Sequence, residues 1–287
     1  MRKAGSLSLK ILLTLTATSG HGAFPPIPGS YTDLAFSVNI GPTTGSCFVL
    51  QASNSVYLAT ARHVLFFDQG ERTNWHLWST QAVVKGFFAR GATEPTPRVM
   101  ELDMADLLAR GEVRFSYTHD LAVVRIEDCN PTNTSLVKAL KGVKFTSPET
   151  ALDIWPVNGL RKLKELVVGS DVVSVGFPSD IGLEEIPQID RTMPLLRKGI
   201  LAGVNQKQGT LILDSPVYGG DSGGPVLLRE TDNLTFSTYH IIGIQTQWVP
   251  FKETWNNLRF GYVNQNLANS GYSVAEPMDS ILEMIWK

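Results

Sequence analysis

Short runs of apolar residues, rich in β-branched and aromatic side chains, recur along the chain between Gly, Pro, Asn and Asp residues. Runs bounded by turn-forming residues in this way predict strands. They span residues 34–40, 46–50, 56–60, 82–88, 121–126, 171–175, 210–213, 225–228 and 238–246. Many short strands at this spacing predict an all-β protein built as a sandwich or barrel.

Clear helical periodicity appears at the C-terminal end of the chain. After Pro277, a residue suited to a first helical turn, apolar residues recur at i, i+3, i+4, i+7 and i+8. They are Met278, Ile281, Leu282, Ile285 and Trp286. The pattern predicts one amphipathic helix over 277–287, and a second, short helix is expected at 104–110.

The segments between the strands indicate two lobes. Residues 128–169 mix polar side chains with three prolines, so we expect this segment to contain the connection between the lobes. The first lobe and its linker then occupy 31–150, and the second lobe occupies 171–270. The long segment 67–118 is expected to carry loops that decorate the first lobe.

Composition excludes two classes of protein. The chain has 287 residues, of which 43% are apolar and 18% charged, as in an ordinary soluble fold. No run approaches the ~18 apolar residues of a membrane-spanning helix. A formal charge of −2 provides no basic field for nucleic acid. The sequence does not indicate an oligomeric state.

The N-terminus has the order of a secretory signal peptide. The basic start Met-Arg-Lys is followed, after Lys10, by an apolar run at 11–18 and small residues at 19–23. This order predicts a cleaved signal at 1–23 and a secreted or periplasmic protein. A frayed terminus is the alternative.

The two cysteines, Cys47 and Cys129, leave two alternatives open. They form one disulfide, or they are two buried free thiols. Cys47 lies in an apolar run without an adjacent base, so its environment does not favour a reactive thiolate.

The segment 219–226, Gly-Gly-Asp-Ser-Gly-Gly-Pro-Val, carries the strongest chemical signal in the chain. Glycines on both sides of Ser222 allow a tight turn that aims successive backbone N–H groups at one point beside the hydroxyl. Such donors stabilise the oxyanion that forms when a serine attacks a carbonyl carbon. We therefore predict Ser222 as nucleophile and the N–H groups of Gly220 and Ser222 as an oxyanion hole.

A serine nucleophile needs a base, and the base needs a group that orients it. His63 follows the strand predicted at 56–60, and Asp120 directly precedes the strand predicted at 121–126. The sequence predicts His63 as general base and Asp120 as the acid that fixes its tautomer. His119 is expected to lie outside the site, because consecutive strand residues point to opposite faces.

Three segments resemble the signatures of the chymotrypsin/trypsin superfamily, in its chain order of His, Asp and Ser. They are Thr-Ala-Arg-His at 60–63, Asp-Leu-Ala-Val-Val at 120–124 and Gly-Asp-Ser-Gly-Gly-Pro at 220–225. Gly-Ser-Cys-Phe-Val at 45–49 and Val-Ser-Val-Gly-Phe-Pro at 173–178 resemble strands of the bacterial members, the Do-like and glutamyl-endopeptidase-like groups.

That resemblance implies two six-stranded antiparallel β-barrels with a cleft between them, followed by the C-terminal helix. It implies a serine endopeptidase that hydrolyses polypeptide substrates through an acyl-enzyme on Ser222, without metal or organic cofactor. The peptidase domain is expected to span 24–287 and to lack a PDZ domain.

The resemblance also carries expectations about specificity. The strand at 241–246 resembles the one that lines the primary pocket, so Thr246 is expected to donate its hydroxyl to Asp120. The remaining pocket residues are expected to be Pro216, Val217, Tyr218, Gln247 and Trp248. Pro216 stands where trypsin-like members carry a pocket-base Asp, so cleavage after Lys or Arg is not expected. A bulky Trp248 near the mouth of the pocket is expected to favour substrates with small or apolar side chains at the cleavage site.

Two departures from the superfamily pattern qualify these expectations. No Cys stands beside His63 or beside Ser222. The disulfides that animal digestive members carry at those two places are therefore not expected. No Ile-Val-Gly-Gly-type start is present, so activation by an ion pair between a new N-terminus and Asp221 is not expected.

Other interpretations of the same residues were weighed. Gly-x-Ser-x-Gly also fits the nucleophile elbow of α/β-hydrolases, but that fold requires a later acid and His, and only His240 follows Ser222. A glycine-rich turn with a capping serine explains the motif alone but not the two other segments. A catalytically silent, protease-like module that binds peptides remains as the alternative function.

Overall fold

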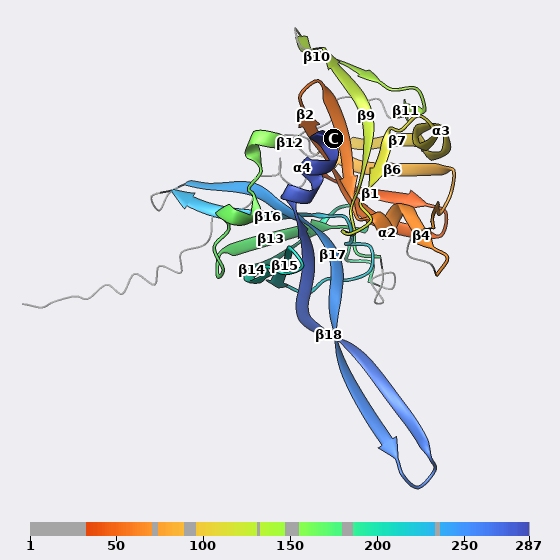
Figure 1. The fold of residues 1–287 in the computed structure, drawn as a ribbon, viewed down its shortest axis with the longest axis vertical. Coiled ribbons are helices and arrows are strands. Elements are labelled where there is room, and N and C mark those ends of the chain that lie inside the picture. Colours follow the sequence, from red (N-terminus) through yellow and green to blue (C-terminus); the bar gives the residue numbers. More distant parts are fainter. Residues whose placement is uncertain are drawn as a thin grey trace, which may run out of the picture.

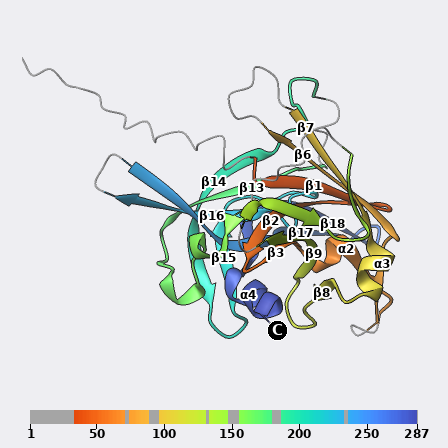
Figure 2. The same cartoon turned by 90° about the horizontal axis from the view of Figure 1, so that it is seen from above.

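The structure is a computed structural model that describes residues 33–70, 74–88, 96–130, 133–146, 155–179, 186–232 and 236–286. The expected signal peptide at 1–23 lies outside the described residues. Two β lobes lie side by side, and a long two-stranded arm projects from one of them (Figure 1). From above, strands β6 and β7 of the first lobe and β13 to β16 of the second lie on different sides of the molecule (Figure 2).

The first lobe is one ten-stranded sheet with the order β10-β9-β3-β2-β1-β6-β7-β11, to which β8 adds beside β9 and β12 beside β2. The β12–β2 pair is parallel, and the other pairs in this sheet are antiparallel. The strands are β1 (Ala35–Ile40), β2 (Thr43–Ala52), β3 (Ser55–Thr60), β6 (Gln81–Phe88), β7 (Thr96–Asp103), β8 (Val113–Phe115), β9 (Ala122–Asn130), β10 (Asn133–Ala139), β11 (Val143–Phe145) and β12 (Trp155–Pro156).

The second lobe is a closed barrel of six antiparallel strands in the order β13-β14-β15-β18-β17-β16. Closure leaves no free sheet edge within the barrel itself. The strands are β13 (Asp171–Gly176), β14 (Leu195–Asn205), β15 (Thr210–Asp214), β16 (Pro225–Asp232), β17 (Phe236–Asn257) and β18 (Tyr262–Pro277).

Small elements join and cover the lobes. Helix α2 (Arg62–Leu65) leads into the hairpin of β4 (Phe66–Asp68) and β5 (Trp75–Leu77), and α3 (Met104–Ala109) follows β7. The 3-10 turns η1 (Val157–Gly159) and η2 (Leu163–Glu165) lie between the lobes in sequence. Helix α4 (Met278–Trp286) closes the described chain and confirms the predicted C-terminal helix. None of these helices is long and apolar enough to cross a bilayer.

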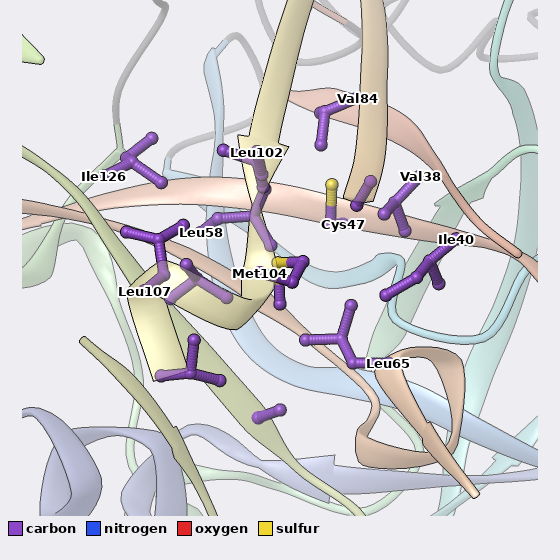
Figure 3. Close-up of a cluster of buried hydrophobic side chains, with 14 of the residues drawn as sticks. Val38, Ile40, Cys47, Leu58, Leu65, Val84, Leu102, Met104, Leu107 and Ile126 are labelled. Atoms are coloured by element: carbon purple, nitrogen blue, oxygen red, sulfur yellow. The ribbon is translucent and has the colours of Figure 1, made fainter. Parts of the chain in front are cut away.

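Strand β2 shows why its sequence is continuously apolar. Cys47 and Val49 belong to the core of the first lobe, whereas Phe48 and Leu50 belong to a second core shared with the barrel and α4. Because successive strand residues point to opposite faces, a strand buried on both faces must be apolar throughout. Figure 3 shows the first-lobe core around Cys47, Leu58 and Leu102.

Cys47 is a free, fully buried thiol, so the disulfide alternative does not hold in this structure. Burial raises its pKa far above the usual range of a thiol, which leaves it protonated and unreactive. The side chain of Cys129 lies outside the described residues.

The all-β class, the two lobes and the C-terminal helix are confirmed, but the first lobe has more strands than the six expected. The segment 67–118 forms strands as well as loops, and 128–169 contributes β10, β11 and β12. In β7, for example, Met100 and Leu102 are buried while Glu101 between them is exposed. Such half-buried strands carry less apolar character than the continuous runs that marked the central strands.

Candidate active site

Strand pairing brings His63 and Asp120 together. Strands β3 and β9 are antiparallel with Thr60 opposite Ala122, so the residues just after β3 meet those just before β9. His63 Nδ1 lies 2.6 Å from Asp120 Oδ2, and the His63 backbone N–H donates to Asp120 Oδ1 at 3.0 Å. With Nδ1 engaged by the carboxylate, Nε2 is the ring nitrogen left to exchange a proton with a substrate or nucleophile.

The protonation state of Asp120 follows from its surroundings. Burial acts to raise the pKa of Asp120, but the hydrogen bonds and charge of His63 and the charge of Arg62 outweigh it and lower the pKa below the ordinary value of an aspartate. Asp120 is therefore an anion at neutral pH.

The helix that carries His63 is anchored at two points. The backbone N–H of Arg62 donates to the Asp120 carbonyl at 3.2 Å, and Trp78 Nε1 donates to the His63 carbonyl at 3.0 Å. The Arg62 guanidinium lies over the ring of Trp75, 3.9 Å from its centroid. These contacts fix the backbone on which the imidazole stands.

The turn that carries Ser222 depends on glycines. Gly220 and Gly223 have φ of +91° and +92°, a region that side chains with a Cβ rarely adopt. A Cβ on Gly223 would also overlap the Ser46 carbonyl oxygen and Thr60 Oγ1. The tight packing allows the Ser46 N–H to donate to the Ser222 carbonyl at 2.7 Å, which ties the second-lobe turn to β2 of the first lobe.

The same junction places Ser222 against the helix of His63. A Cβ built on Gly45 would lie 3.0 Å from the Ser222 carbonyl oxygen and 2.6 Å from the side chain of Val64. The backbone of the turn and the residue after His63 therefore approach one another across a single glycine.

Two backbone N–H groups of this turn remain available. The amides of Asp221, Gly223 and Gly224 donate within the protein, to Tyr218, Gln245 and Asp221 respectively. Among the described residues, none accepts a hydrogen bond from the N–H of Gly220 or Ser222. These are the two N–H groups that the sequence predicted as oxyanion donors, and each is free to donate to a group placed beside Ser222.

Ser46 holds the peptide next to these donors, a role that sequence analysis missed. Its hydroxyl donates to the Gly220 carbonyl at 2.7 Å and accepts the Phe177 N–H at 2.9 Å. Ser46 is fully buried, so this bridge between β2, the turn and the end of β13 is shielded from water.

A buried ion pair fixes the residue before the nucleophile. Arg197 of β14 lies 2.5 Å from Asp221 Oδ2, and their side chains are only 14% and 3% exposed. The same carboxylate oxygen accepts the Tyr218 N–H at 3.0 Å. Asp221 thus has an internal cation, in line with the expectation that it does not wait for a new N-terminus. Arg197 was not predicted, because its partner Asp221 lies 24 positions later in the chain and no local pattern links the two residues.

The hydroxyl of Ser222 is held weakly. Its hydrogen bond runs to the Thr246 carbonyl at 3.5 Å, the limit of hydrogen-bond length. Within the part of the chain that the structure describes, no hydrogen bond joins this hydroxyl to His63. The structure brings the three predicted residues to one junction of the lobes, with the His63–Asp120 contact formed and the Ser222–His63 contact unformed.

The expected hydrogen bond from Thr246 to Asp120 is wrong. Thr246 Oγ1 donates to the Val274 carbonyl at 3.3 Å, within the pairing of β17 and β18. Glu276 of β18 approaches Asp120 instead, and its Oε1 accepts the Asp120 N–H at 3.4 Å. Its Oε2 lies 2.8 Å from His119 Nδ1. His119 is thus a partner of Glu276, and within the described chain it has no hydrogen bond to His63 or Ser222. No local pattern predicts this contact, because His119 and Glu276 lie 157 positions apart in the chain.

The predicted pocket residues flank the Ser222 turn on two segments. Val217 is buried, and its carbonyl accepts from Asn269 Nδ2 at 2.7 Å. Tyr218 lies beside Arg197, whose guanidinium is 4.9 Å from the ring centroid. On β17, Thr246 is buried, whereas Gln247 and Trp248 are exposed, Trp248 by 39%. Pro216 is half-buried.

Acidic, histidine and cysteine side chains gather nowhere in the described ranges in a group of three or more that would hold a metal ion.

Comparison with known proteins places the chain in a family. A family model of the trypsin-like peptidase domain matches residues 45–234. No curated protein matched the chain.

Three solved structures illustrate the similarity. The HtrA-type protease AlgW with a tripeptide is 17% identical with a TM-score of 0.45, covering 91% of this chain and 63% of AlgW, so the chain spans less than two thirds of that protein. Deg5 is 16% identical with a TM-score of 0.44, covering 89% of this chain and 88% of Deg5. The protease Anisep from Arthrobacter nicotinovorans is 11% identical with a TM-score of 0.45, covering 86% and 90%. Since the family match spans well over half of the 287 residues, the chain belongs to the trypsin-like peptidase family, within the trypsin-like serine protease superfamily.

Proposed function

We propose that this peptidase is a serine endopeptidase in which Ser222 is the nucleophile, His63 the general base and Asp120 the acid that orients the base. The observation that carries the proposal is that two half-sites meet between the lobes: the His63–Asp120 pair of the first lobe and the Ser222 turn of the second. A His63–Asp120 pair with a 2.6 Å contact faces a glycine turn whose Gly220 and Ser222 N–H groups have no acceptor among the described residues. Acyl transfer to a serine requires these groups: a base for the hydroxyl proton and hydrogen-bond donors for the oxyanion.

In the proposed reaction, the Ser222 hydroxyl leaves the Thr246 carbonyl and donates to His63 Nε2 when a peptide occupies the cleft. His63 takes the proton as Ser222 Oγ bonds to the scissile carbonyl carbon, and the carbonyl oxygen becomes an oxyanion on the Gly220 and Ser222 N–H groups. Protonated His63 then protonates the leaving amine, and the C–N bond breaks. Water repeats these steps on the acyl-enzyme and releases the carboxylate product and free Ser222.

The remaining sequence expectations are part of the same proposal. The polypeptide substrate lies between the segment Pro216, Val217, Tyr218 and the segment Thr246, Gln247, Trp248, and the exposed Trp248 limits the pocket to small or apolar side chains. The signal at 1–23 directs the mature domain, 24–287, to the periplasm or the medium. The proposed domain division is a first lobe with its linker at 31–150, a second lobe at 171–270 and a final helix at 277–287. In the structure β12 (Trp155–Pro156) adds to the first-lobe sheet, β18 extends the barrel to Pro277, and the helix spans Met278–Trp286.

Turnover by a Ser222→Ala variant tests the proposal. We expect hydrolysis of an unfolded polypeptide by the wild-type protein and none above background by the variant at any pH. Thermal unfolding of the two proteins should coincide, because the substitution removes only the hydroxyl of Ser222, whose hydrogen bond to the Thr246 carbonyl is 3.5 Å long. Peptidase activity retained by Ser222→Ala would refute the assignment of the nucleophile.

One observation favours the alternative function, a catalytically silent module that binds peptides. The Ser222 hydroxyl donates to the Thr246 carbonyl and has no hydrogen bond to His63 among the described residues. A silent module would bind a peptide without cleaving it, and Ser222→Ala would leave its affinity unchanged. Cleavage of the peptide by the wild-type protein excludes this alternative.

A further inference from the structure

The arm in Figure 1 is a two-stranded ribbon made by the outer parts of β17 and β18. Its pairs run from Pro250 opposite Asn269 to Asn257 opposite Tyr262. Strand β16 pairs with β17 only as far as Ile244, and β15 pairs with β18 only from Tyr272 inward. In the described chain no third strand pairs with residues 250–269. Side chains on both faces of the arm are exposed to solvent.

The tip of the arm, residues 258–261, displays apolar side chains. Leu258 is 94% exposed and Phe260 is 70% exposed. The turn is held in shape because Asn257 Oδ1 accepts the N–H groups of Arg259 and Phe260, at 3.1 and 3.0 Å. The ordered turn fixes the backbone that carries these two exposed side chains at the end of the arm.

Amphipathic aromatic side chains follow directly behind the tip. Trp255 is 51% exposed, and Tyr262 is 56% exposed. Tyr262 lies opposite Asn257, and Asn257 is two residues from Trp255, so both rings lie on the same face of the ribbon. Behind them the ribbon carries Thr254, Asn264, Gln265 and Asn266.

The outer part of the arm carries charge of one sign, whereas Lys252 and Glu253 lie nearer the lobes. From residue 254 to residue 275 the only charged side chain is Arg259, whose guanidinium lies 5.4 Å from the centroid of the Phe260 ring. No carboxylate in this stretch opposes an anionic surface. A cation at an apolar tip pairs with anionic head groups that lie just above a hydrocarbon phase.

Over residues 254–266, the outer part of the arm, the order of side-chain chemistry matches the order of layers in a bilayer. Leu258 and Phe260 come first, Trp255 and Tyr262 second, and mainly neutral polar side chains third, as acyl chains, interface and water succeed one another along the membrane normal. A protein groove imposes no such order by depth. Nearer the lobes the ribbon carries the exposed apolar residues Phe251 and Leu267 and the charged residues Lys252 and Glu253. The arm also stands clear of both lobes (Figure 1), so its tip reaches a flat surface before the rest of the molecule does.

We propose that the arm is a membrane-docking device whose tip inserts into the interface of an anionic lipid bilayer. Leu258 and Phe260 enter the acyl boundary, Trp255 and Tyr262 lie at the level of the head groups, and Arg259 pairs with lipid phosphate. Strand β17 also carries Thr246 beside Ser222. Docking of the tip therefore keeps the candidate active site away from the membrane surface, at a distance set by the length of the arm.

Co-sedimentation of the full chain with vesicles tests this inference. The vesicles contain equimolar phosphatidylcholine and phosphatidylglycerol, and pure phosphatidylcholine vesicles serve for comparison. We expect a Leu258→Asn/Phe260→Asn variant to lose at least about tenfold in its partition coefficient, since two exposed apolar side chains no longer enter the lipid. Arg259→Gln should weaken binding about fivefold on the anionic vesicles alone.

Leu267→Asn is the matched control. Leu267 is 56% exposed but lies on the opposite face of the ribbon from Trp255, away from the tip, so its variant should bind as the wild type does. Unchanged thermal unfolding of all variants checks that the barrel is intact. The inference is overturned if the wild type does not sediment with anionic vesicles, or if the tip variant sediments equally well. It is also overturned if the tip variant changes the oligomeric state in sedimentation velocity, because the tip then binds a second copy of the chain.

Discussion

The two lobes fix their parts of the candidate active site by different physical means. In the first lobe, regular antiparallel pairing of β3 and β9 delivers His63 and Asp120 to adjacent strand ends, with 2.6 Å between Nδ1 and Oδ2. In the second lobe, an irregular turn carries Ser222 and is shaped by positive-φ glycines and a buried Asp221–Arg197 pair. The His63–Asp120 contact follows from regular strand pairing, whereas the Ser222 turn depends on particular residues, namely its glycines and the Asp221–Arg197 ion pair.

The largest effect should come from the first-lobe pair. Asp120→Asn keeps the size of the side chain but allows the wrong tautomer of His63, so we expect kcat to fall by about 10⁴-fold with little change in KM. Steady-state hydrolysis of a peptide measures both constants. A loss of less than tenfold would show that strand pairing alone, without the charge, positions the base.

The second lobe should be more sensitive in stability. Arg197→Met removes the cation and leaves Asp221 buried without it, which should lower the free energy of unfolding by about 3–5 kcal/mol and reduce turnover as the turn relaxes. Denaturant unfolding measures the first effect.

Lys198→Met is the matched control for Arg197→Met. Lys198 is the next residue along β14, and its ion pair with Asp171 is largely exposed, so we expect its loss to cost less than about 1 kcal/mol. Equal losses in the two variants would contradict a special role for Arg197.

A carboxyl inside the first-lobe sheet should give a pH-dependent effect. Glu127 on β9 is 4% exposed, and burial raises its pKa from 4.5 to about 7. The folded state therefore holds this proton after the unfolded state has lost it, so stability falls as pH rises from 4.5 to about 7. Glu127→Gln should raise stability by about 2 kcal/mol above pH 7 and leave it unchanged below about pH 4. Thermal melts at both pH values measure the difference, and equal gains at both would contradict the burial of an ionising group.

The smallest effect concerns the residue of the second lobe that reaches the first-lobe pair. Glu276 accepts the Asp120 N–H, so Glu276→Ala should reduce kcat about fivefold, the equivalent of one modest hydrogen bond. Glu276→Gln keeps an oxygen acceptor and should restore most of kcat without a change in KM. If both variants behave alike, Glu276 acts through its charge rather than by positioning Asp120.

The sequence revealed those parts of the molecule in which local pattern and structure agree. The apolar runs identified the central strands, and the segments around His63, Asp120 and Ser222 identified the chemistry, because strands buried on both faces and glycine turns leave local signals. Ser46, Arg197 and Glu276 were missed, since each acts through contacts between strands distant in the chain. The arm was also missed, because residues 250–269 pack against no core and their apolar side chains do not alternate regularly with polar ones.

Labelling by a fluorophosphonate, followed by peptide mapping in a mass spectrometer, tests the central claim most directly. The probe reacts with a serine only when a base and an oxyanion hole activate it. We predict one adduct, on Ser222 of the wild-type protein, and none on His63→Ala or Ser222→Ala. An unlabelled wild-type Ser222 under conditions in which the protein is folded, or equal labelling of His63→Ala, would contradict the joining of the two half-sites.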